Sequence, residues 1–434
     1  MLAYYFNLAL RSFRRNRALT ALMVLAIALG IGASMTTLTV FHVLSGDPIP
    51  QKSDRLFVVQ LDPQPAAGYN PGDEPDTQLT RYDAEELLRQ KKAKRQALMT
   101  GGGGIVEPAG TALKPFGIDG RYASADFFPM FEAPFRHGRG WTAQDDERRA
   151  RVVVIGKSLN ERLFGGADST GRSLRISGND LRIVGVLDEW NPVPHFYDLN
   201  TGRYGNSEEV FIPFSPAMDL KLGRNGSMNC FGESANADNT AVGAPCTWIQ
   251  YWIELDGPAA ATEYKAYLDN YSLQQRSAGR YQRPPNTRLR DVMAWLDFNQ
   301  VVPGDVHLQL WLALAFLLVC LVNTVGLLLA KFLRRSGEIG VRRALGASRS
   351  AIFAQYLVEA VTIGMAGGLL GLALAFLGLW GVRQQPVDYA ELARIDLPML
   401  ALTFVLSLVA SVLAGMLPAW RAMQVAPAIQ LKSQ

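Results

Sequence analysis

Four long stretches without a charged residue constrain this chain more than any other feature. They contain no Asp, Glu, Lys or Arg, and they cover residues 18–46, 308–330, 360–382 and 397–420. About 20 consecutive apolar residues are enough for a helix to cross a bilayer. Over the whole chain only 19% of residues are charged, which is below the share typical of soluble proteins. The sequence therefore predicts an α-helical membrane protein with four transmembrane helices, and it excludes a soluble enzyme, a disordered chain and a disulfide-stapled miniprotein.

The first charge-free stretch follows several arginines, as the apolar core of a signal peptide does. A cleaved signal peptide has an apolar core of only about 7–15 residues and small residues at its cleavage site. The stretch at 18–46 is much longer. We therefore expect an uncleaved signal anchor that forms the first span.

The basic residues around the spans predict their orientation, because loops rich in Lys and Arg stay in the cytoplasm. Residues 1–17, 331–359 and 421–434 together contain twelve basic and two acidic residues, whereas 47–307 and 383–396 contain 31 basic and 37 acidic residues. We therefore expect both termini and the 331–359 loop to be cytoplasmic, in the inner membrane of a bacterium. The net charge of +4 reflects this asymmetry and does not indicate nucleic-acid binding.

Apolar residues at the N-terminus recur with helical spacing. Leu2, Phe6, Leu10 and Phe13 share one side of a helix, with arginines beyond them. We expect a cytoplasmic amphipathic helix over 1–17 that lies at the membrane interface. The alternative is a frayed tail.

Residues 47–307 show short mixed patterns that favour a large extracytoplasmic α+β domain between the first two spans, with two lobes. Helices are expected at 81–96 and at 157–164, the second capped by Ser158. The glycines at 101–104 indicate a flexible turn. Strands are expected at 55–61, 151–155, 174–176, 181–186 and 210–213, and a long loop at 191–247.

Two of the three cysteines lie in this domain. Cys230 and Cys246 are sixteen residues apart within the 191–247 segment. On the oxidising side of a bacterial membrane such a pair favours a disulfide, and the alternative is two free thiols. Cys320 lies inside the second span.

The sequence contains no constellation that indicates catalysis. The four histidines are scattered without metal-ligand spacing, and the acidic run at 145–147 indicates a solvated turn. Residues 166–173 fit a phosphate-loop pattern, but a helix precedes them, a strand follows, and Arg172 replaces the lysine. We therefore expect a turn there, no cofactor or metal on this chain, and an energy source elsewhere.

The loop after the second span carries a specific motif. A short amphipathic helix is expected from Ser336, ended by Gly346, before Ser348 caps the helix that leads into the third span. The residues between them form a basic elbow in which Ile339 and Leu345 are expected to be buried. The alternative is an ordinary positive-inside loop, but the length and the lone Glu338 favour a docking surface.

The elbow sequence RRSGEIGVRRALGA at 334–347 resembles the coupling loop of the MacB/FtsX-like ABC transporter permeases. The tail LPAWRAMQVAPAIQL at 417–431 also resembles that family, although Gln430 stands where alanine is usual. In the large domain, SADFF at 124–128 and LFG at 163–165 match the family's pattern, while 191–247 matches less well.

This resemblance implies a permease dimer, of identical or related chains, bound to two copies of a separate ABC ATPase that would hold ATP and Mg. The resemblance also implies that the periplasmic MacB-like domain spans 47–307, and that spans cover 18–46, 308–332, 353–382 and 397–420. Between and after them lie a coupling loop at 333–352, a short periplasmic loop at 383–396 and a cytoplasmic tail at 421–434. The residues expected to contact the ATPase are Gly337, Glu338, Ile339, Gly340, Arg342, Arg343, Leu345 and Gly346.

Two features of the spans fit a mechanical transmitter, which is how the resembled family works. No charged residue is expected inside a span, so a polar pathway at the membrane midplane is not indicated. Gly367 and Gly371 form a GxxxG pair that favours close helix packing, and the alternative is a generic glycine-rich span.

The resemblance implies an ATP-driven exporter that works with a periplasmic membrane-fusion protein and an outer-membrane channel. Two alternatives keep the fold: a lipoprotein-releasing transporter and an FtsX-type regulator of a cell-wall hydrolase. A membrane-anchored sensor is a fourth hypothesis, disfavoured by the lack of any kinase-like region. The sequence does not identify the substrate.

Overall fold

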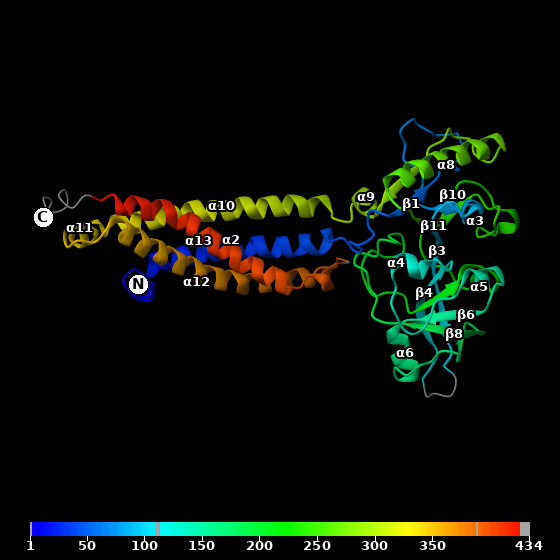
Figure 1. The fold of residues 1–434 in the computed structure, drawn as a ribbon, viewed down its shortest axis with the longest axis horizontal. Coiled ribbons are helices and arrows are strands. Elements are labelled where there is room, and N and C mark those ends of the chain that lie inside the picture. Colours follow the sequence, from blue (N-terminus) through cyan, green and yellow to red (C-terminus); the bar gives the residue numbers. More distant parts are fainter. Residues whose placement is uncertain (1, 109–112, 388, 426–434) are drawn as a thin grey trace. The chain divides into compact units, whose positions relative to one another are not determined.

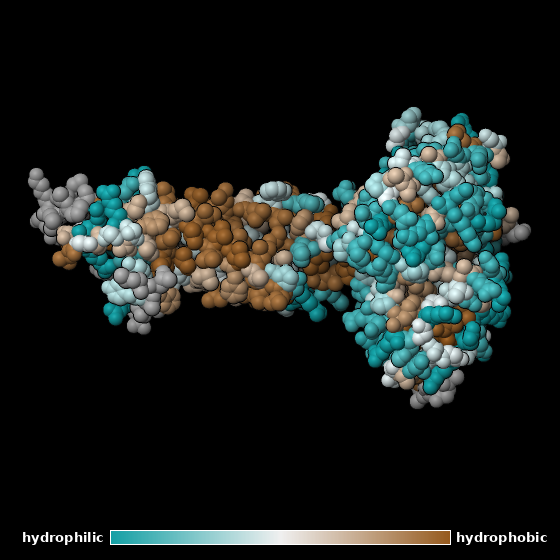
Figure 2. Space-filling model, in the orientation of Figure 1, coloured by the Kyte–Doolittle hydropathy of each residue, from teal (hydrophilic) through white to brown (hydrophobic). Residues whose placement is uncertain are grey.

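The computed structural model describes residues 2–108, 113–387 and 389–425. The chain divides into a membrane unit, residues 1–45 and 302–434, and an intervening domain, residues 46–301. The membrane unit is a bundle of long helices, and the intervening domain is a mixed sheet with short helices (Figure 1). Figure 2 shows apolar side chains over the long helices and mainly polar ones over the intervening domain.

Four helices of the membrane unit are long and apolar enough to cross a membrane, one before the intervening domain and three after it, which confirms the predicted arrangement. They are α2 (Arg17–Ser45), α10 (Gly304–Leu333), α12 (Arg349–Arg383) and α13 (Leu397–Met423). Helix α2 packs against α10 and α12, and α12 packs against α13. The shorter helices are α1 (Leu2–Arg15), α11 (Ser336–Ala344) and the 3-10 turn η2 (Ala390–Leu392).

Helix α1 forms where the sequence predicts it, but its packed side differs from the predicted apolar stripe. Ala9 and Ser12 are buried, and α1 packs against α12, whereas Tyr4 and Phe6 are exposed. Phe13 of the predicted stripe is half-buried against the apolar cluster of the membrane unit, so the described part of the stripe is covered only in part. The side chains of Leu2 and Leu10 lie outside the described part, as do residues 426–431 of the tail motif.

Glycines bring α12 close to two neighbours. A Cβ atom on Gly367 would lie 2.7 Å from Ile27 Cγ2 of α2, and one on Gly371 would lie 3.0 Å from Ile31 Cβ. The predicted GxxxG pair therefore faces α2. A second pair, which the sequence reading missed, faces α13: Gly364 against Ser411 and Gly368 against Ser407. In lipid such close backbone approach is a main source of helix association.

The intervening domain is built on one 12-stranded, mostly antiparallel sheet in the order β12-β1-β11-β3-β4-β9-β6-β8-β5, with β4–β9 and β6–β8 parallel. Strands β2 and β10 also pair with β11, and β7 pairs with β3 and β8. The strands are β1 (Leu56–Gln60), β2 (Leu79–Thr80), β3 (Arg95–Val106), β4 (Phe116–Ala123), β5 (Phe135–Gly138), β6 (Val152–Ile155), β7 (Ser173–Ile176), β8 (Asn179–Leu187), β9 (Val210–Pro213), β10 (Asn229–Cys230), β11 (Cys246–Glu254) and β12 (Arg288–Asp291).

Helices and loops cover both faces of this sheet, so successive residues of the inner strands enter different cores. Val153 and Ile155 of β6 belong to one apolar cluster, and Val152 and Val154 to the other. This division follows from the alternation of side chains along a strand. The helices are α3 (Arg81–Gln90), α4 (Phe127–Phe131), α5 (Ala143–Glu147), α6 (Lys157–Phe164), α7 (Phe214–Asp219), η1 (Ala235–Ala237), α8 (Pro258–Ser277) and α9 (Val292–Phe298).

Two predictions near β3 are wrong. The helix expected over 81–96 ends at Gln90, because Lys91 takes a left-handed conformation and the Gln96 side chain donates to the carbonyls of Leu87 and Leu88. The glycines at 101–104 form no turn and lie inside β3. They are glycines because the strand is crowded there: a Cβ on Gly104 would lie 2.7 Å from Ile176.

Other local predictions also differ from the structure. Gly156, and not Ser158, occupies the N-cap position of α6, so this helix begins without a side-chain cap. The acidic run at 145–147 belongs to the short helix α5, because Thr142 and Asp145 form a capping box. The segment at 191–247 contains β9, α7, β10 and η1, so it is more structured than a long loop. Residues 166–172 of the phosphate-loop look-alike lie between α6 and β7, as expected for a turn, and Ser173 begins β7.

Candidate functional site

The elbow, residues 334–348, is formed by α11 and the turns on either side of it. Helix α11 ends at Ala344, and Gly346 follows with a φ of 96°, a conformation that favours glycine. Ser348 then accepts a hydrogen bond from the Ala351 amide and caps α12, as predicted. These local signals place α11 between α10 and α12.

One side of α11 packs against the membrane unit. Ile339 is 1% exposed and belongs to the apolar cluster of the helices, and Gly340 beside it is buried. Arg343 donates to the carbonyls of Met423 (3.3 Å) and Val425 (2.8 Å). A guanidinium there binds the free carbonyls at the C-terminal end of α13 and complements its dipole.

The other side of α11 is exposed and partly apolar. Leu345 is 83% exposed and Val341 is 51% exposed, and Gly337, Glu338 and Gly346 are exposed as well. The expected burial of Leu345 is therefore wrong, because it follows the last turn of α11 and lies off the packed side. Val341 was absent from the predicted set, although its helical spacing from Glu338 and Leu345 could have indicated it.

A charged pair lies between these two sides. Arg342 donates to Glu338 one turn earlier over 2.8 Å, and to Gln355 of α12 over the same distance. An exposed pair of this kind contributes little to stability. Of the eight residues expected to dock, Ile339, Gly340 and Arg343 pack or bind within this chain, and Arg342 is half-buried and bonded to Gln355. The other four, Gly337, Glu338, Leu345 and Gly346, are exposed.

Behind the elbow lies a buried ionic cluster that contradicts the expectation of spans without charge. Both residues of its central pair, Lys331 and Glu359, lie just outside the charge-free stretches at 308–330 and 360–382, but α10 continues to Leu333 and α12 begins at Arg349, so both lie within the long helices. Lys331 Nζ is 2.7 Å from Glu359 Oε1, and Arg335 is 3.7 Å from the same oxygen. Ser12 of α1 also donates to Glu359.

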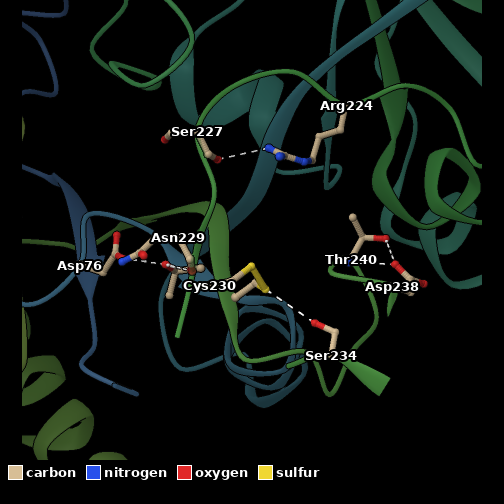
Figure 3. Close-up of a disulfide and its surroundings, with 10 residues drawn as sticks. Asp76, Arg224, Ser227, Asn229, Cys230, Ser234, Asp238 and Thr240 are labelled. Atoms are coloured by element: carbon tan, nitrogen blue, oxygen red, sulfur yellow. Dashed lines mark hydrogen bonds between the residues drawn. A yellow bond between two sulfur atoms is a disulfide. The ribbon is translucent and has the colours of Figure 1, made fainter. Parts of the chain in front are cut away.

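In the intervening domain, Cys230 and Cys246 form a disulfide between facing positions of β10 and β11. Figure 3 shows its neighbours: Ser234 Oγ is 3.8 Å from Cys246 Sγ, and Asn229 donates to Asp76 over 2.9 Å. The disulfide thereby pins the segment before β11 to the sheet. Cys320 in α10 is a buried free thiol.

Two electrostatic features of this domain escaped the sequence reading. Arg121, 2% exposed, pairs with Asp198 (2.6 Å) and with Glu208. Burial disfavours its charge, but these carboxylates together raise the pKa of Arg121. Burial also raises the pKa of Asp146 to about 7, although the Ala125 amide donates to it.

Within the described residues, no group of three or more His, Cys, Asp or Glu side chains could hold a metal ion. The arrangement offers a helical elbow with an exposed apolar side, attached to a bundle whose helices are closely packed.

Comparison with known families identifies this arrangement. The family described as "MacB-like periplasmic core domain" matches residues 20–271, more than half of the chain, and "FtsX-like permease C-terminal" matches residues 311–427. The chain belongs to the MacB/FtsX-like ABC transporter permeases. The elbow and the long helices after it lie within the FtsX-like match.

Named relatives of this permease are exporters. It is 24% identical over 426 residues to the pyoverdine export ATP-binding/permease protein PvdT of Pseudomonas aeruginosa, covering 96% of this chain and 57% of the relative. It is 28% identical over 262 residues to the macrolide export ATP-binding/permease protein MacB of Rhodopirellula baltica, covering 56% of this chain and 35% of the relative. The chain thus spans about half or less of the length of these relatives.

A solved structure is also similar. The periplasmic region of MacB from Actinobacillus actinomycetemcomitans aligns with 59% of this chain and 96% of its own, with 14% identity and a TM-score of 0.37.

Proposed function

We propose that this chain is the permease of an ATP-driven exporter of the MacB type. In this proposal it lies in the bacterial inner membrane with both termini in the cytoplasm and with residues 46–301 in the periplasm. The excess of basic residues at 1–17, 331–359 and 421–434 supports this orientation.

The observation that carries the proposal is the exposed side of the elbow. Leu345 and Val341 leave an apolar surface open beside Glu338, at the loop that resembles the family's ATPase contact. Exposed apolar residues next to a charge are typical of a protein interface. We propose that this side docks on an ABC ATPase, with Gly337, Arg342 and Gly346 at its edge.

ATP hydrolysis then belongs to the ATPase, which supplies ATP and Mg binding, and this chain transmits the movement. We propose two ATPase copies and a permease dimer, as the family resemblance implies. Closure of the ATPase would shift the elbow, and with it α10 and α12. Because α2 and α10 each continue directly into residues 46–301, their shift would displace the intervening domain.

The substrate class follows only by analogy with relatives that are named for pyoverdine and macrolide export. We propose efflux of a small organic molecule, together with a periplasmic membrane-fusion protein and an outer-membrane channel. A lipoprotein-releasing transporter and a hydrolase regulator remain the competing outcomes of the test.

The test is affinity purification of the tagged chain from native membranes in mild detergent, with identification of its companions by mass spectrometry. We expect an ABC ATPase and a membrane-fusion protein. A lipoprotein chaperone or a cell-wall hydrolase with the ATPase would move the function to a competing hypothesis. Absence of any ABC ATPase would contradict the transporter proposal.

Matched variants make this test specific to the elbow. Leu345→Glu combined with Val341→Glu places charge on the proposed interface, and it should remove the ATPase from the purified complex. Leu273→Glu, at an exposed apolar position of α8, should leave the ATPase bound. Loss of the ATPase from both variants would show that the loss does not depend on the exposed side of the elbow.

A further inference from the structure

The ionic cluster behind the elbow connects several segments of the membrane unit, and not only the two helices of its ion pair. Glu359 of α12 is 3% exposed and Lys331 of α10 is fully buried. Lys331 Nζ lies 2.7 Å from Glu359 Oε1 and 3.5 Å from the hydroxyl of Thr20 in α2. One carboxylate is therefore in contact with α10, and through Lys331 with α2.

The same carboxylate also holds the N-terminal helix. Ser12, 6% exposed, donates its hydroxyl hydrogen to Glu359 Oε1, and the ring of Phe13 lies 5.8 Å from Lys331 Nζ. Among the described side chains of α1, Ala9 and Ser12 are buried, so the packed side of this helix includes the residue that contacts the cluster. Figure 1 shows α1 and α11 at the same end of the bundle.

The elbow begins at this point too. Arg335, which directly precedes α11, has a guanidinium nitrogen 3.7 Å from Glu359 Oε1. Beside it, the rings of Phe332 in α10 and Tyr356 in α12 lie 4.3 Å apart. The start of α11, the end of α10 and α1 thus meet at one position of α12.

We propose that Glu359 is a positioning residue that clamps α1, the end of α10 and the start of the elbow to α12, so that they move as one body. The physical reason is the cost of burying an unpaired charge in low dielectric. Lys331 and Glu359 each need the other, so separation of α10 from α12 is opposed more strongly than apolar packing alone would oppose it.

The role of this clamp in transport rests on the proposed function, but the experiment that tests the clamp does not. If the elbow receives movement from an ATPase, the clamp passes it to α1 as well as to α10 and α12. Helix α1 would then be a third moving part at the membrane surface, with Tyr4 and Phe6 exposed toward the interface. The clamp itself can be measured without any ATPase.

The measurement is the distribution of distances between spin labels at Tyr4→Cys and Ala344→Cys, in the full chain in lipid nanodiscs. Both positions are exposed, and Cys320→Ala removes the free thiol. We expect a narrow distribution in the parent. Glu359→Gln keeps the shape but removes the charge, and it should at least double the width.

Three further variants separate the clamp from a general loss of structure. Lys331→Glu combined with Glu359→Lys restores the opposite charges and should narrow the distribution again, which a purely structural defect would not do. Ser12→Ala removes the bond from α1 and should broaden the distribution by itself. Thr324→Val removes a buried hydroxyl that bonds the Cys320 carbonyl of its own helix, and it should change nothing.

An unchanged width in Glu359→Gln would overturn the proposal. So would equal broadening in Thr324→Val, or a charge exchange that stays as broad as Glu359→Gln. A narrow parent distribution in a chain that binds no ABC ATPase would contradict the proposed function and leave the clamp intact.

Discussion

The intervening domain buries large side chains on both faces of one sheet, whereas the membrane unit brings its helices together at glycines and serines. Trp248 and Trp252 are each at most 1% exposed and lie in opposite cores of the sheet. In the bundle, Gly367 and Gly368 of α12 lie against Ile27 and Ser407. The surrounding solvent accounts for this contrast, because water favours burial of apolar area and lipid does not.

Both units also bury charge, but in different ways. Arg121 is enclosed by carboxylates and hydrogen bonds within one core, next to Asp198 and Glu208. Glu359 lies where separate helices meet. The first cluster stabilises a fixed fold, and the second, in our proposal, keeps moving parts together.

The largest effect is expected from Arg121→Met, which leaves two carboxylates buried without their partner. Removing one partner of a buried ion pair costs about 3–5 kcal/mol of unfolding free energy. Urea unfolding of the full chain, followed by tryptophan fluorescence, measures it. Arg149→Met breaks an exposed pair with Asp219 and should cost at most about 1 kcal/mol. Equal losses in both variants would contradict the contrast between buried and exposed pairs.

Removal of the disulfide should have the next largest effect. Cys230→Ser combined with Cys246→Ser opens a loop of sixteen residues, which corresponds to about 3 kcal/mol in the chain-entropy account. The same unfolding measurement, repeated with a reductant, tests the cause. Reductant should destabilise the parent and leave the double variant unchanged, and a parent insensitive to reductant would contradict the assignment.

In the membrane unit, a larger side chain at a helix contact should lower the stability. Gly368→Val places side-chain atoms where Ser407 of α13 lies, so the helices must separate, at a cost of about 1–3 kcal/mol. Thermal unfolding in nanodiscs measures the loss. The matched control is Gly326→Val in α10, where a Cβ meets no atom within 4 Å, and it should have little effect. A larger loss at Gly326 would show that these glycines do not set the packing.

The last effect concerns pH in the intervening domain. Burial raises the pKa of Asp146 to about 7 in the folded chain, against about 4 in an unfolded one. Between these values the folded state binds the extra proton, so stability should fall as pH rises from about 4 to about 7 and then level off. Asp146→Asn should reduce that slope in thermal unfolding of the full chain. If the dependence of stability on pH is unchanged in Asp146→Asn, the raised pKa of Asp146 is contradicted.

The sequence predicted the membrane unit better than the intervening domain, for a physical reason. A bilayer requires long uncharged helices, so the spans are visible in the composition of the sequence. The spacing of Gly367 and Gly371 likewise indicated a packing face. The extent of the spans was harder to predict, because Lys331 and Glu359 compensate each other's charge across α10 and α12.

The errors in the intervening domain come from contacts between distant segments. The glycines at 101–104 look like a turn, yet a Cβ atom at each of them would lie too close to atoms of distant segments, such as Asn225 and Ile176. The sequence around Arg121 in β4 does not indicate a buried ion pair, because its partners Asp198 and Glu208 lie in a distant loop. Leu345 was expected to be buried because it is apolar, but the sequence does not show which side of α11 is covered.

The most direct test of the central claim is site-specific photo-crosslinking from Leu345. A benzophenone amino acid there, in cells that express the full chain, should capture an ABC ATPase, identified by mass spectrometry. The same probe at Leu273, also exposed and apolar, should not capture it. Crosslinks from Leu345 that contain no ABC ATPase, in a chain that reaches the membrane, would contradict the account of the elbow as the docking surface.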